Sequence, residues 1–423
     1  MKLDTVRSAY TDSVNFFGQT TPYELLERFG GPLYVYNEAI LRKRCQELKS
    51  LSEQPKFGVN YSIKANSNLA LLRIIRSEGL FADAMSPGEV FLAEMAGFAK
   101  NQILFVCNNV SGLEMRFPLE RGITVSVDSL AQLEELGRVN PGGKAVLRIN
   151  PGIGAGHHKK VITAGGETKF GIGLGDIPAM LEILKRHNLK LAGFNQHIGS
   201  LFMDSSGYLE AVDFLLDLAK DFVDTLELLD FGGGFGIPYH KYEGQERLDI
   251  ATTAKGFNQR ITAFAKETGY QGEFLVEPGR YIAAECGLLL GEVRAVKNNG
   301  PTRFVGTDLG FNCLMRPVMY DSFHDIEIYR QGSGPQMELM EQTIVGNICE
   351  SGDILAKKRL LPEIKQGDIV AALDAGAYGY VMSSSYNQRL RPAEVLIDLQ
   401  GQPRLIRRRE TLEDLLALTP IDV

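Results

Sequence analysis

The sequence predicts an α/β protein: a (β/α)8 barrel, the TIM-barrel fold, with a C-terminal β-sandwich or β-barrel domain. Two observations carry this prediction. From about residue 56 the chain alternates short apolar and β-branched runs with longer segments whose apolar residues recur every three or four positions. After about residue 285 the strand-like runs continue without helical segments between them. The first pattern is typical of repeated βα units, and eight such units close a barrel.

The barrel strands are expected where apolar runs end in polar or glycine-rich residues. The eight runs are 56–65, 79–86, 102–108, 122–129, 144–151, 191–199, 226–234 and 272–279. Helical periodicity is clear in the intervening segments 68–77, 88–96, 130–139, 177–186 and 208–223. We therefore expect the barrel domain to span residues 30–285.

The β domain is expected from the remaining strand-like runs. They are 288–296, 303–308, 326–329, 343–349, 368–373 and a hairpin at 393–408 that turns at residues 400–403. Residues 1–29 and 286–423 are assigned to this domain. The run 32–37 precedes the barrel strands and is expected to join the β domain, which would then be assembled from both ends of the chain.

The charge composition excludes one class of partner. The 423 residues include 45 basic and 52 acidic side chains, for a net charge of −7. This balance argues against a nucleic-acid partner, which needs clustered Lys and Arg. The only dense basic run, Arg407–Arg409, is interpreted as a solvated strand end.

Location and redox state are also predicted from the sequence. No apolar stretch approaches the roughly 20 residues of a membrane-spanning helix, and no apolar signal core follows the start. We expect a cytoplasmic protein without a membrane partner. Its five cysteines are scattered, without a Cys-x-x-Cys pair, so reduced thiols and no zinc site are expected. His157 and His158 are interpreted as loop residues rather than metal ligands.

Four strand ends carry residues that suit one cofactor. The first strand ends at Lys64, whose pKa burial would lower, although a lysine extending to solvent at the barrel rim is an alternative. The run Gly232–Gly234 would expose backbone N–H groups to a phosphate, or is simply a tight turn. His197 offers a flat ring and Glu277 a carboxylate. An amine, a flat partner, an acid and a phosphate cup together describe a pyridoxal 5′-phosphate site.

Glu277 is the most informative of the four. A carboxylate beside the pyridine nitrogen keeps that nitrogen protonated, which makes the ring a strong electron sink. This arrangement favours decarboxylation.

The sequence resembles the fold-type III pyridoxal-phosphate decarboxylases, and most closely the diaminopimelate decarboxylases, over about residues 25 to 410. The similarity rests on eight strings in a fixed order. They are Tyr61-Ser62-Ile63-Lys64-Ala65-Asn66-Ser67-Asn68, Lys169-Phe170-Gly171-Ile172, His197-Ile198-Gly199-Ser200, Gly232-Gly233-Gly234, Glu277-Pro278-Gly279-Arg280, Met315-Arg316-Pro317 with Tyr320, Cys349-Glu350-Ser351-Gly352-Asp353, and Asp374-Ala375-Gly376-Ala377-Tyr378-Gly379.

The resemblance implies a role for each matching residue. Lys64 would form the Schiff base with the cofactor, His197 would stack on its ring, and Glu277 would pair with its ring nitrogen. Cys349 would be the general acid, where a buried, inert cysteine is the alternative. The phosphate would be held by Ser200, Gly232, Gly233, Gly234, Glu277, Pro278, Gly279, Arg280 and Tyr378.

The resemblance also implies the substrate and the assembly. Arg280, Arg316, Tyr320, Glu350 and Tyr378 match the substrate-binding positions of the family. An arginine suits a distal carboxylate and an anion suits a distal amine. The implied reaction converts meso-2,6-diaminoheptanedioate to L-lysine and carbon dioxide, the last step of lysine synthesis. The implied assembly is a homodimer in which the neighbouring subunit donates the Cys349–Glu350 pair.

Other functions stay open at this point. The enzyme alternative is a decarboxylase of another diamino acid, such as carboxynorspermidine, D-ornithine or D-lysine. A racemase of the same fold typically sets Arg against the ring nitrogen, which Glu277 disfavours. A catalytically silent homologue would lack Lys64, Glu277 or Cys349, all present here. Two departures from the common family pattern, Asn195-Gln196 before His197 and the loop 152–168, bear on substrate preference.

Overall fold

The computed structural model describes residues 5–152 and 169–420, and the chain divides into two compact units. The barrel unit comprises Arg42–Ile237 and Arg247–Ile282. The β unit comprises Met1–Leu41, Pro238–Glu246 and Ala283–Val423. Most of loop 152–168, with its two histidines, lies outside the described residues.

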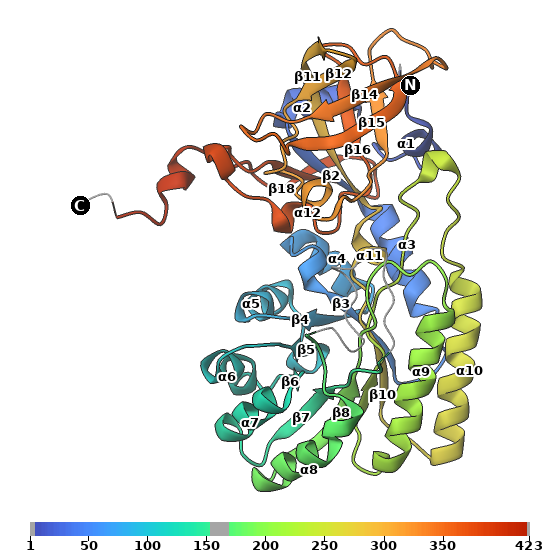
Figure 1. The fold of residues 1–423 in the computed structure, drawn as a ribbon, viewed down its shortest axis with the longest axis vertical. Coiled ribbons are helices and arrows are strands. Elements are labelled where there is room, and N and C mark those ends of the chain that lie inside the picture. The colour runs from blue at the N-terminus through green and yellow to red at the C-terminus, as the bar shows by residue number, and fades with distance from the viewer. Residues whose placement is uncertain (1–4, 153–168, 421–423) are drawn as a thin grey trace. The chain divides into compact units, whose positions relative to one another are not determined.

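The barrel unit contains a closed ring of eight parallel strands, ordered β10-β3-β4-β5-β6-β7-β8-β9 (Figure 1). The predicted (β/α)8 barrel is confirmed, and each strand falls within a predicted run to within one residue. The strands are β3 (Phe57–Ser62), β4 (Phe81–Ala84), β5 (Ile103–Val106), β6 (Thr124–Val127), β7 (Lys144–Arg148), β8 (Lys190–Asn195), β9 (Leu228–Asp230) and β10 (Glu273–Val276).

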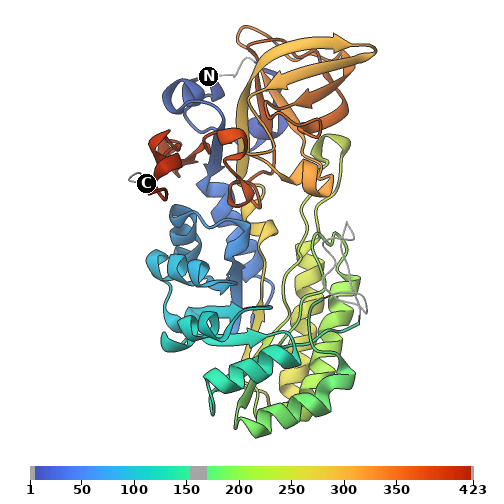
Figure 2. The same cartoon turned by 60° about the vertical axis from the view of Figure 1, so that its left-hand side comes forward.

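Helices cover the outside of the strand ring (Figures 1 and 2). Three of them begin at a serine after a strand, because the hydroxyl of Ser86, Ser111 or Ser129 accepts the N–H three residues on. None of the described helices has the length and apolar character needed to cross a bilayer. The helices are α3 (Glu38–Lys49), α4 (Leu69–Ser77), α5 (Pro87–Ala96), α6 (Gly112–Glu120), α7 (Leu130–Val139), α8 (Ile177–Arg186), α9 (Ser206–Ala219), α10 (Ile250–Thr268) and α11 (Arg280–Ala283).

Helices α6 and α10 are two of the barrel helices that were not among the predicted helical segments. Helix α6 contains Pro118 in its interior, a residue that usually breaks or kinks a helix. In α10 the buried Phe257, Ile261 and Phe264 do recur at helical spacing, but polar residues separate them. Both helices therefore owe their stability to tertiary packing more than to their local sequence pattern.

The β unit is built on a ten-stranded mixed sheet with the path β1-β13-β16-β11-β12-β14-β15. Strand β2 pairs antiparallel with β11 and parallel with β17, which in turn pairs with β18. The strands are β1 (Thr5–Arg7), β2 (Leu33–Asn37), β11 (Gly287–Asn299), β12 (Thr302–Thr307), β13 (Ile326–Tyr329), β14 (Leu339–Val345), β15 (Ile354–Pro362), β16 (Ile369–Ala372), β17 (Ala393–Ile397) and β18 (Pro403–Arg407). Its short helices are α1 (Ala9–Ser13), α2 (Pro22–Phe29) and α12 (Arg316–Tyr320).

The structure corrects the sequence-based strands of the β unit in two places. Strand β15 was missed, because Lys357 to Arg359 interrupt its apolar pattern and Lys358 has a positive φ of 47°. Strand β14 lies a few residues before its predicted position. Helix α12 also breaks the expected all-strand order, and it carries Arg316.

The interpretation of Arg407–Arg409 as a solvated strand end holds only in part: β18 ends at Arg407 and Arg408 is exposed, but all three arginines have partners. Arg407 forms an ion pair with Glu394, which is fully buried. Arg408 binds Asp414, and Arg409 Nη2 donates to the Pro32 carbonyl at 2.6 Å. Each arginine therefore binds a residue in another segment of the β unit.

Candidate active site

The predicted cofactor residues of the barrel unit all follow the carboxyl ends of its strands. Lys64 lies in the single turn Ile63–Ala65 that continues β3. His197 follows β8, the three glycines follow β9, and Glu277 follows β10. Because β10 pairs with both β3 and β9, the closed ring brings these distant sequence positions to one end of the barrel.

Lys64 is half-buried rather than extended to solvent. Its Nζ lies 3.4 Å from Met85 Sδ, which follows β4. Its charge also lowers the pKa of Asp83 and of Glu277, against the effect of their burial. The charge of the amine therefore acts on the buried acidic groups at this end of the barrel.

The glycine turn packs tightly against its neighbours. Gly233 N–H donates to His197 Nδ1 at 3.1 Å, so Nδ1 carries the lone pair and any ring proton lies on Nε2. A Cβ on Gly233 would lie 2.0 Å from the Glu277 carbonyl oxygen. Burial lowers the pKa of His197 well below its usual value, as do Arg148 and Lys64. The turn thus holds a neutral imidazole in a fixed orientation.

Glu277 belongs to a buried acidic cluster with Asp83 and Asp230. Burial raises the pKa of Glu277 well above its usual value, and Asp230 and Asp83 raise it further. Burial likewise raises the pKa of Asp230 to about 7. No donor among the described residues reaches Glu277 Oε1, Asp230 Oδ2 or Asp83 Oδ1, all of which are buried, and a proton on Glu277 would be shared with Asp230.

Arg148, at the end of β7, is the cationic member of this cluster. The sequence analysis missed it, together with Asp83 and Asp230. It is 6% exposed, and its Nε and Nη2 atoms have no hydrogen-bond partner among the described residues. Burial lowers its pKa, and the nearby Glu277 and Asp128 raise it. A charged residue at the end of an apolar strand was the only available sequence signal.

This arrangement fits pyridoxal 5′-phosphate. The unpartnered, buried Glu277 Oε1 offers the acceptor that a protonated ring nitrogen needs, and buried polar groups are otherwise almost always satisfied. Lys64 supplies the amine. Ser200 Oγ accepts from Arg280 Nη2 at 3.0 Å, which places a hydroxyl and a guanidinium next to each other at this end of the barrel.

Four of the five predicted substrate residues, Arg316, Tyr320, Glu350 and Tyr378, lie in the β unit, and Arg280 lies in the barrel unit. Arg316 is buried, with 2% exposure, and its Nη1 contacts His324 Nε2 at 3.0 Å. Tyr320 ends the same helix, α12. Tyr378 is half-buried and has a positive φ of 56°, a conformation that non-glycine residues adopt rarely.

Cys349 differs from the other four cysteines because it alone is exposed. Its N–H donates to Asn387 Oδ1 at 2.7 Å, and Glu350 Oε1 accepts from the Tyr386 hydroxyl at 2.6 Å. Asp353 orders the same loop by accepting the Ile348 N–H at 2.7 Å. Burial raises the pKa of the Cys45, Cys107 and Cys313 thiols to about 12. A buried Cys349 is therefore ruled out.

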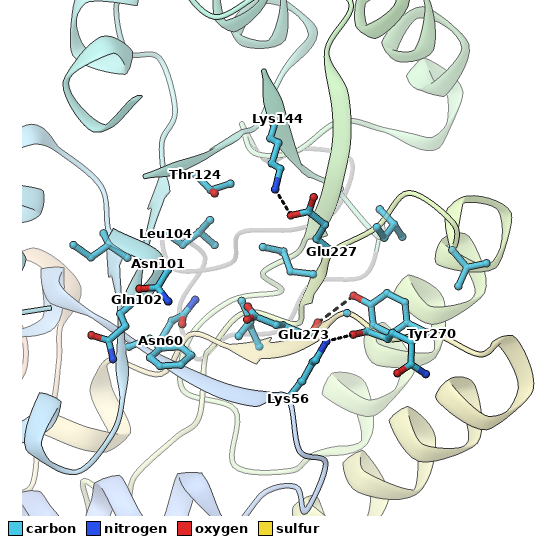
Figure 3. Close-up of a pocket in the computed structure, with 18 of the residues that line it drawn as sticks. Lys56, Asn60, Asn101, Gln102, Leu104, Thr124, Lys144, Glu227, Tyr270 and Glu273 are labelled. Carbon is cyan, nitrogen blue, oxygen red and sulfur yellow. Dashed lines mark hydrogen bonds and ion pairs between the residues drawn. The ribbon is translucent and has the colours of Figure 1, made fainter. Parts of the chain in front are cut away.

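A cavity of about 700 Å³ lies at the opposite ends of the barrel strands (Figure 3). Lys56 precedes β3, and Lys144 and Glu273 begin β7 and β10. In Figure 3 Lys144 and Glu227 point toward each other, with Nζ and Oε2 at 2.6 Å. This is the amino-terminal face of the barrel, so the cavity is not part of the candidate active site.

Comparison with known proteins decides the family. The model of the pyridoxal-dependent decarboxylase pyridoxal-binding domain matches residues 38–284. Diaminopimelate decarboxylase of Methanothermobacter thermautotrophicus is 40% identical over 407 residues, or 94% of each chain. The chain belongs to the diaminopimelate decarboxylase family. The Escherichia coli K12 member is 37% identical over 92% of this chain and 94% of its own.

Solved structures of diaminopimelate decarboxylases have the same fold. A Helicobacter pylori structure, complexed with L-lysine, superposes with a TM-score of 0.85 at 31% identity, covering 94% of this chain and 98% of its own. Another family member gives a TM-score of 0.88 at 35% identity, covering 96% and 99%. The chain is therefore a carboxy-lyase of this family, with pyridoxal 5′-phosphate as its cofactor.

Proposed function

We propose that this diaminopimelate decarboxylase family member removes one carboxylate of meso-2,6-diaminoheptanedioate and releases L-lysine and carbon dioxide, the last step of lysine synthesis. The observation that carries the proposal is the buried, unpartnered Glu277 Oε1 at the same end of the barrel as Lys64. The product follows from the substrate, because loss of the carboxylate at the D centre leaves an L-amino acid.

The barrel unit would hold the cofactor. Lys64 Nζ would bind its aldehyde carbon, His197 would stack on its ring, and Glu277 would contact its ring nitrogen. Its phosphate would be held by Ser200, Gly232, Gly233, Gly234, Pro278, Gly279 and Arg280, with Tyr378 supplied by the β unit. Bound pyridoxal phosphate supplies an electron sink for the electron pair that remains when carbon dioxide leaves.

Glu277 holds the proton that the ring nitrogen needs. Burial and the neighbouring Asp230 raise the pKa of this carboxyl well above its usual value, although Lys64 lowers it, so the protonated form is favoured. With the cofactor bound, Glu277 would share this proton with the ring nitrogen and pair with it as a carboxylate. Asp230, whose pKa is also raised, opposes the loss of the proton from Glu277 to water.

Cys349 and Glu350 would act at the reacting carbon and at the distal end of the substrate. Cys349 Sγ delivers the proton that replaces the carboxylate. Glu350 binds the distal amine. The exposure of Cys349 supports this role, because a general acid must reach the substrate.

Arg316, Tyr320 and Arg280 would recognise the distal carboxylate. A guanidinium binds a carboxylate through two parallel hydrogen bonds, whereas an amine offers it no acceptor. A pocket built for this group rejects substrates that lack it, since its buried donors would stay unsatisfied. D-Ornithine and D-lysine are therefore expected to be poor substrates.

The proposal includes a homodimer and a cytoplasmic location. The family resemblance of the Cys349–Glu350 loop supports a shared site, in which the neighbouring subunit supplies this loop. Mixing Lys64→Ala and Cys349→Ala subunits should restore about a quarter of wild-type activity, because half of the dimers are hybrids with one intact site each. No recovery after subunit exchange, in particles shown to be hybrids, contradicts the shared site.

The substrate is tested by carbon dioxide release from the reconstituted enzyme. We expect turnover of meso-diaminoheptanedioate and little release from D-ornithine, D-lysine or carboxynorspermidine. Arg316→Ala should raise the KM of the first substrate by at least about tenfold. Preferred turnover of a substrate without a distal carboxylate contradicts the assignment.

A further inference from the structure

His324 is a buried histidine of the β unit to which neither the sequence analysis nor the proposed mechanism gives a role. It lies between α12 and β13 and is 1% exposed. Its ring packs edge-on against Tyr239, with ring centres 5.6 Å apart. Both of its nitrogens are in contact with polar groups. Nδ1 lies 2.6 Å from the Leu373 carbonyl oxygen, and Nε2 lies 3.0 Å from Arg316 Nη1.

The two partners define the tautomer of His324. A carbonyl oxygen can only accept a hydrogen bond, so Nδ1 carries the proton. A guanidinium can only donate, so Nε2 presents its lone pair to Arg316. His324 is therefore neutral, and it uses its one donor and its one acceptor in opposite directions.

These contacts fix the direction of the Arg316 side chain. Its Nη2 also donates to Ser322 Oγ at 3.3 Å, and its guanidinium carbon lies 5.0 Å from the centre of the Tyr239 ring. His324, Ser322 and Tyr239 are neutral groups, so these three contacts orient the guanidinium through hydrogen bonds and a ring contact rather than through a carboxylate. Such an orientation suits a cation that must receive an incoming carboxylate.

His324 also connects Arg316 with the segment that carries Tyr378. Leu373 directly precedes Asp374, and its N–H donates to the Asp325 carbonyl at 2.9 Å. Its carbonyl accepts from His324, so both polar groups of this residue are fastened by the 324–325 pair. Lys241 Nζ then holds Asp374 at 2.7 Å. His324 therefore links the side chain of Arg316 to the residue that precedes the Asp374–Tyr378 segment.

We propose that His324 is a positioning residue that aims Arg316 at the distal carboxylate of the substrate and so contributes to substrate selectivity. The inference rests on the proposed role of Arg316. It predicts that loss of the Nε2 acceptor weakens binding only of molecules that carry the distal carboxylate. L-Lysine, the product, keeps that carboxylate, whereas 1,5-diaminopentane is the same molecule without it.

The test compares His324→Asn with His324→Gln in the cofactor-loaded enzyme. Asparagine keeps a donor for the Leu373 carbonyl but does not reach Arg316, whereas glutamine places an oxygen near the position of Nε2. His324→Asn should raise the KM of meso-diaminoheptanedioate and the Kd of L-lysine together by about 10- to 30-fold, with kcat within about threefold of wild type. His324→Gln should recover most of the loss. Binding of 1,5-diaminopentane should not change in either variant.

A matched control is His187→Asn in the barrel unit. His187 is half-buried, and its Nε2 lies 2.8 Å from Glu134 Oε1. This substitution should leave all three ligand affinities unchanged. Equal losses for L-lysine and 1,5-diaminopentane in His324→Asn, or a lower kcat with unchanged KM, would overturn the positioning role.

A double-mutant cycle separates this inference from the proposed function. If Arg316→Met leaves L-lysine binding unchanged, the proposed role of Arg316 is wrong. If Arg316→Met weakens L-lysine binding but His324→Asn does not, only the role of His324 is wrong. The expected result is that His324→Asn costs no further affinity in the Arg316→Met background.

Should His324→Asn fail to fold, the wild-type enzyme provides the test. The six histidines allow selective labelling with 15N for NMR. We expect His324 to keep its proton on Nδ1, as His240 does beside Glu243, and only the Nε2 signal of His324 to shift with L-lysine and not with 1,5-diaminopentane. A His324 signal that is insensitive to L-lysine overturns the inference.

Discussion

Each unit of the chain buries a cluster of carboxylates, and the two clusters differ in how their oxygens are used. In the barrel unit, Asp83, Asp230 and Glu277 each keep one buried oxygen without a partner among the described residues. In the β unit, Asp374 has both oxygens within 2.8 Å of Lys241 Nζ. Buried polar groups are normally satisfied, so the barrel cluster is the exception that needs a ligand.

The other carboxylates of the β unit follow the same rule as Asp374. Glu327 accepts from the Tyr242 hydroxyl at 2.6 Å and from the Tyr329 hydroxyl at 2.8 Å. Asp325 Oδ2 accepts the Tyr242 N–H at 3.1 Å. A buried charged cluster therefore indicates function only when some of its polar atoms are left unsatisfied.

The largest expected difference in kcat is between substitutions of two lysines, Lys64 and Lys56. Lys64→Ala should lower kcat by at least about 10³-fold, because it removes the amine that binds the cofactor, while the thermal midpoint changes little. Carbon dioxide release and the visible absorbance of the bound cofactor measure the loss. Lys56→Ala is the matched control at the opposite end of β3, at the cavity of Figure 3, and should be fully active.

The next largest difference is expected between Glu277 of the barrel cluster and Glu327 of the β-unit cluster, when each is replaced by glutamine. Glu277→Gln should lower kcat by about 10²- to 10³-fold, because an amide does not hold the ring nitrogen protonated. Glu327→Gln should leave kcat nearly unchanged but lower the thermal midpoint, since its NH2 group would face donors. Steady-state kinetics and calorimetry on both variants test the contrast, and a normal kcat in Glu277→Gln contradicts it.

Lys241→Met should act on stability. It leaves the buried Asp374 without its cation, at a cost of about 3 kcal/mol in the free energy of unfolding. Urea unfolding of the wild type and the variant measures the difference. Lys241→Arg keeps the charge and should recover part of the loss. An unchanged stability of Lys241→Met means that the β-unit cluster is not held together by this ion pair.

The smallest effect concerns pH and the cofactor-free protein. Burial raises the folded-state pKa of Asp230 to about 7, against about 3.9 when unfolded. The folded state therefore binds the proton more tightly, and its contribution to stability is present below about pH 4 and is lost as pH rises to about 7. Asp230→Asn should flatten this fall, by up to about 1.4 kcal/mol for each pH unit of that range. Calorimetry between pH 5 and 8, on the unloaded wild type and variant, measures the slope; equal slopes contradict the assignment.

Much of the barrel and its cofactor residues could be predicted from the sequence. Lys64, His197, Gly232–Gly234 and Glu277 stand next to apolar runs, and the carboxyl ends of parallel strands meet at one face. Helix α10 and strand β15 could not be predicted with the same ease, because polar residues interrupt their patterns. There, packing against the rest of the unit outweighed local preference.

The sequence by itself determined the fold class, the cofactor and the candidate catalytic residues, because these depend on periodicity and on motifs of adjacent residues. Only the tertiary structure decided which buried groups stay unsatisfied and which are paired. Arg148 and Asp83 join Glu277 only because the strand ring closes, and His324 meets Leu373 only because β13 pairs with β16. Contacts between residues so far apart in the chain are set by strand pairing, which no local pattern records.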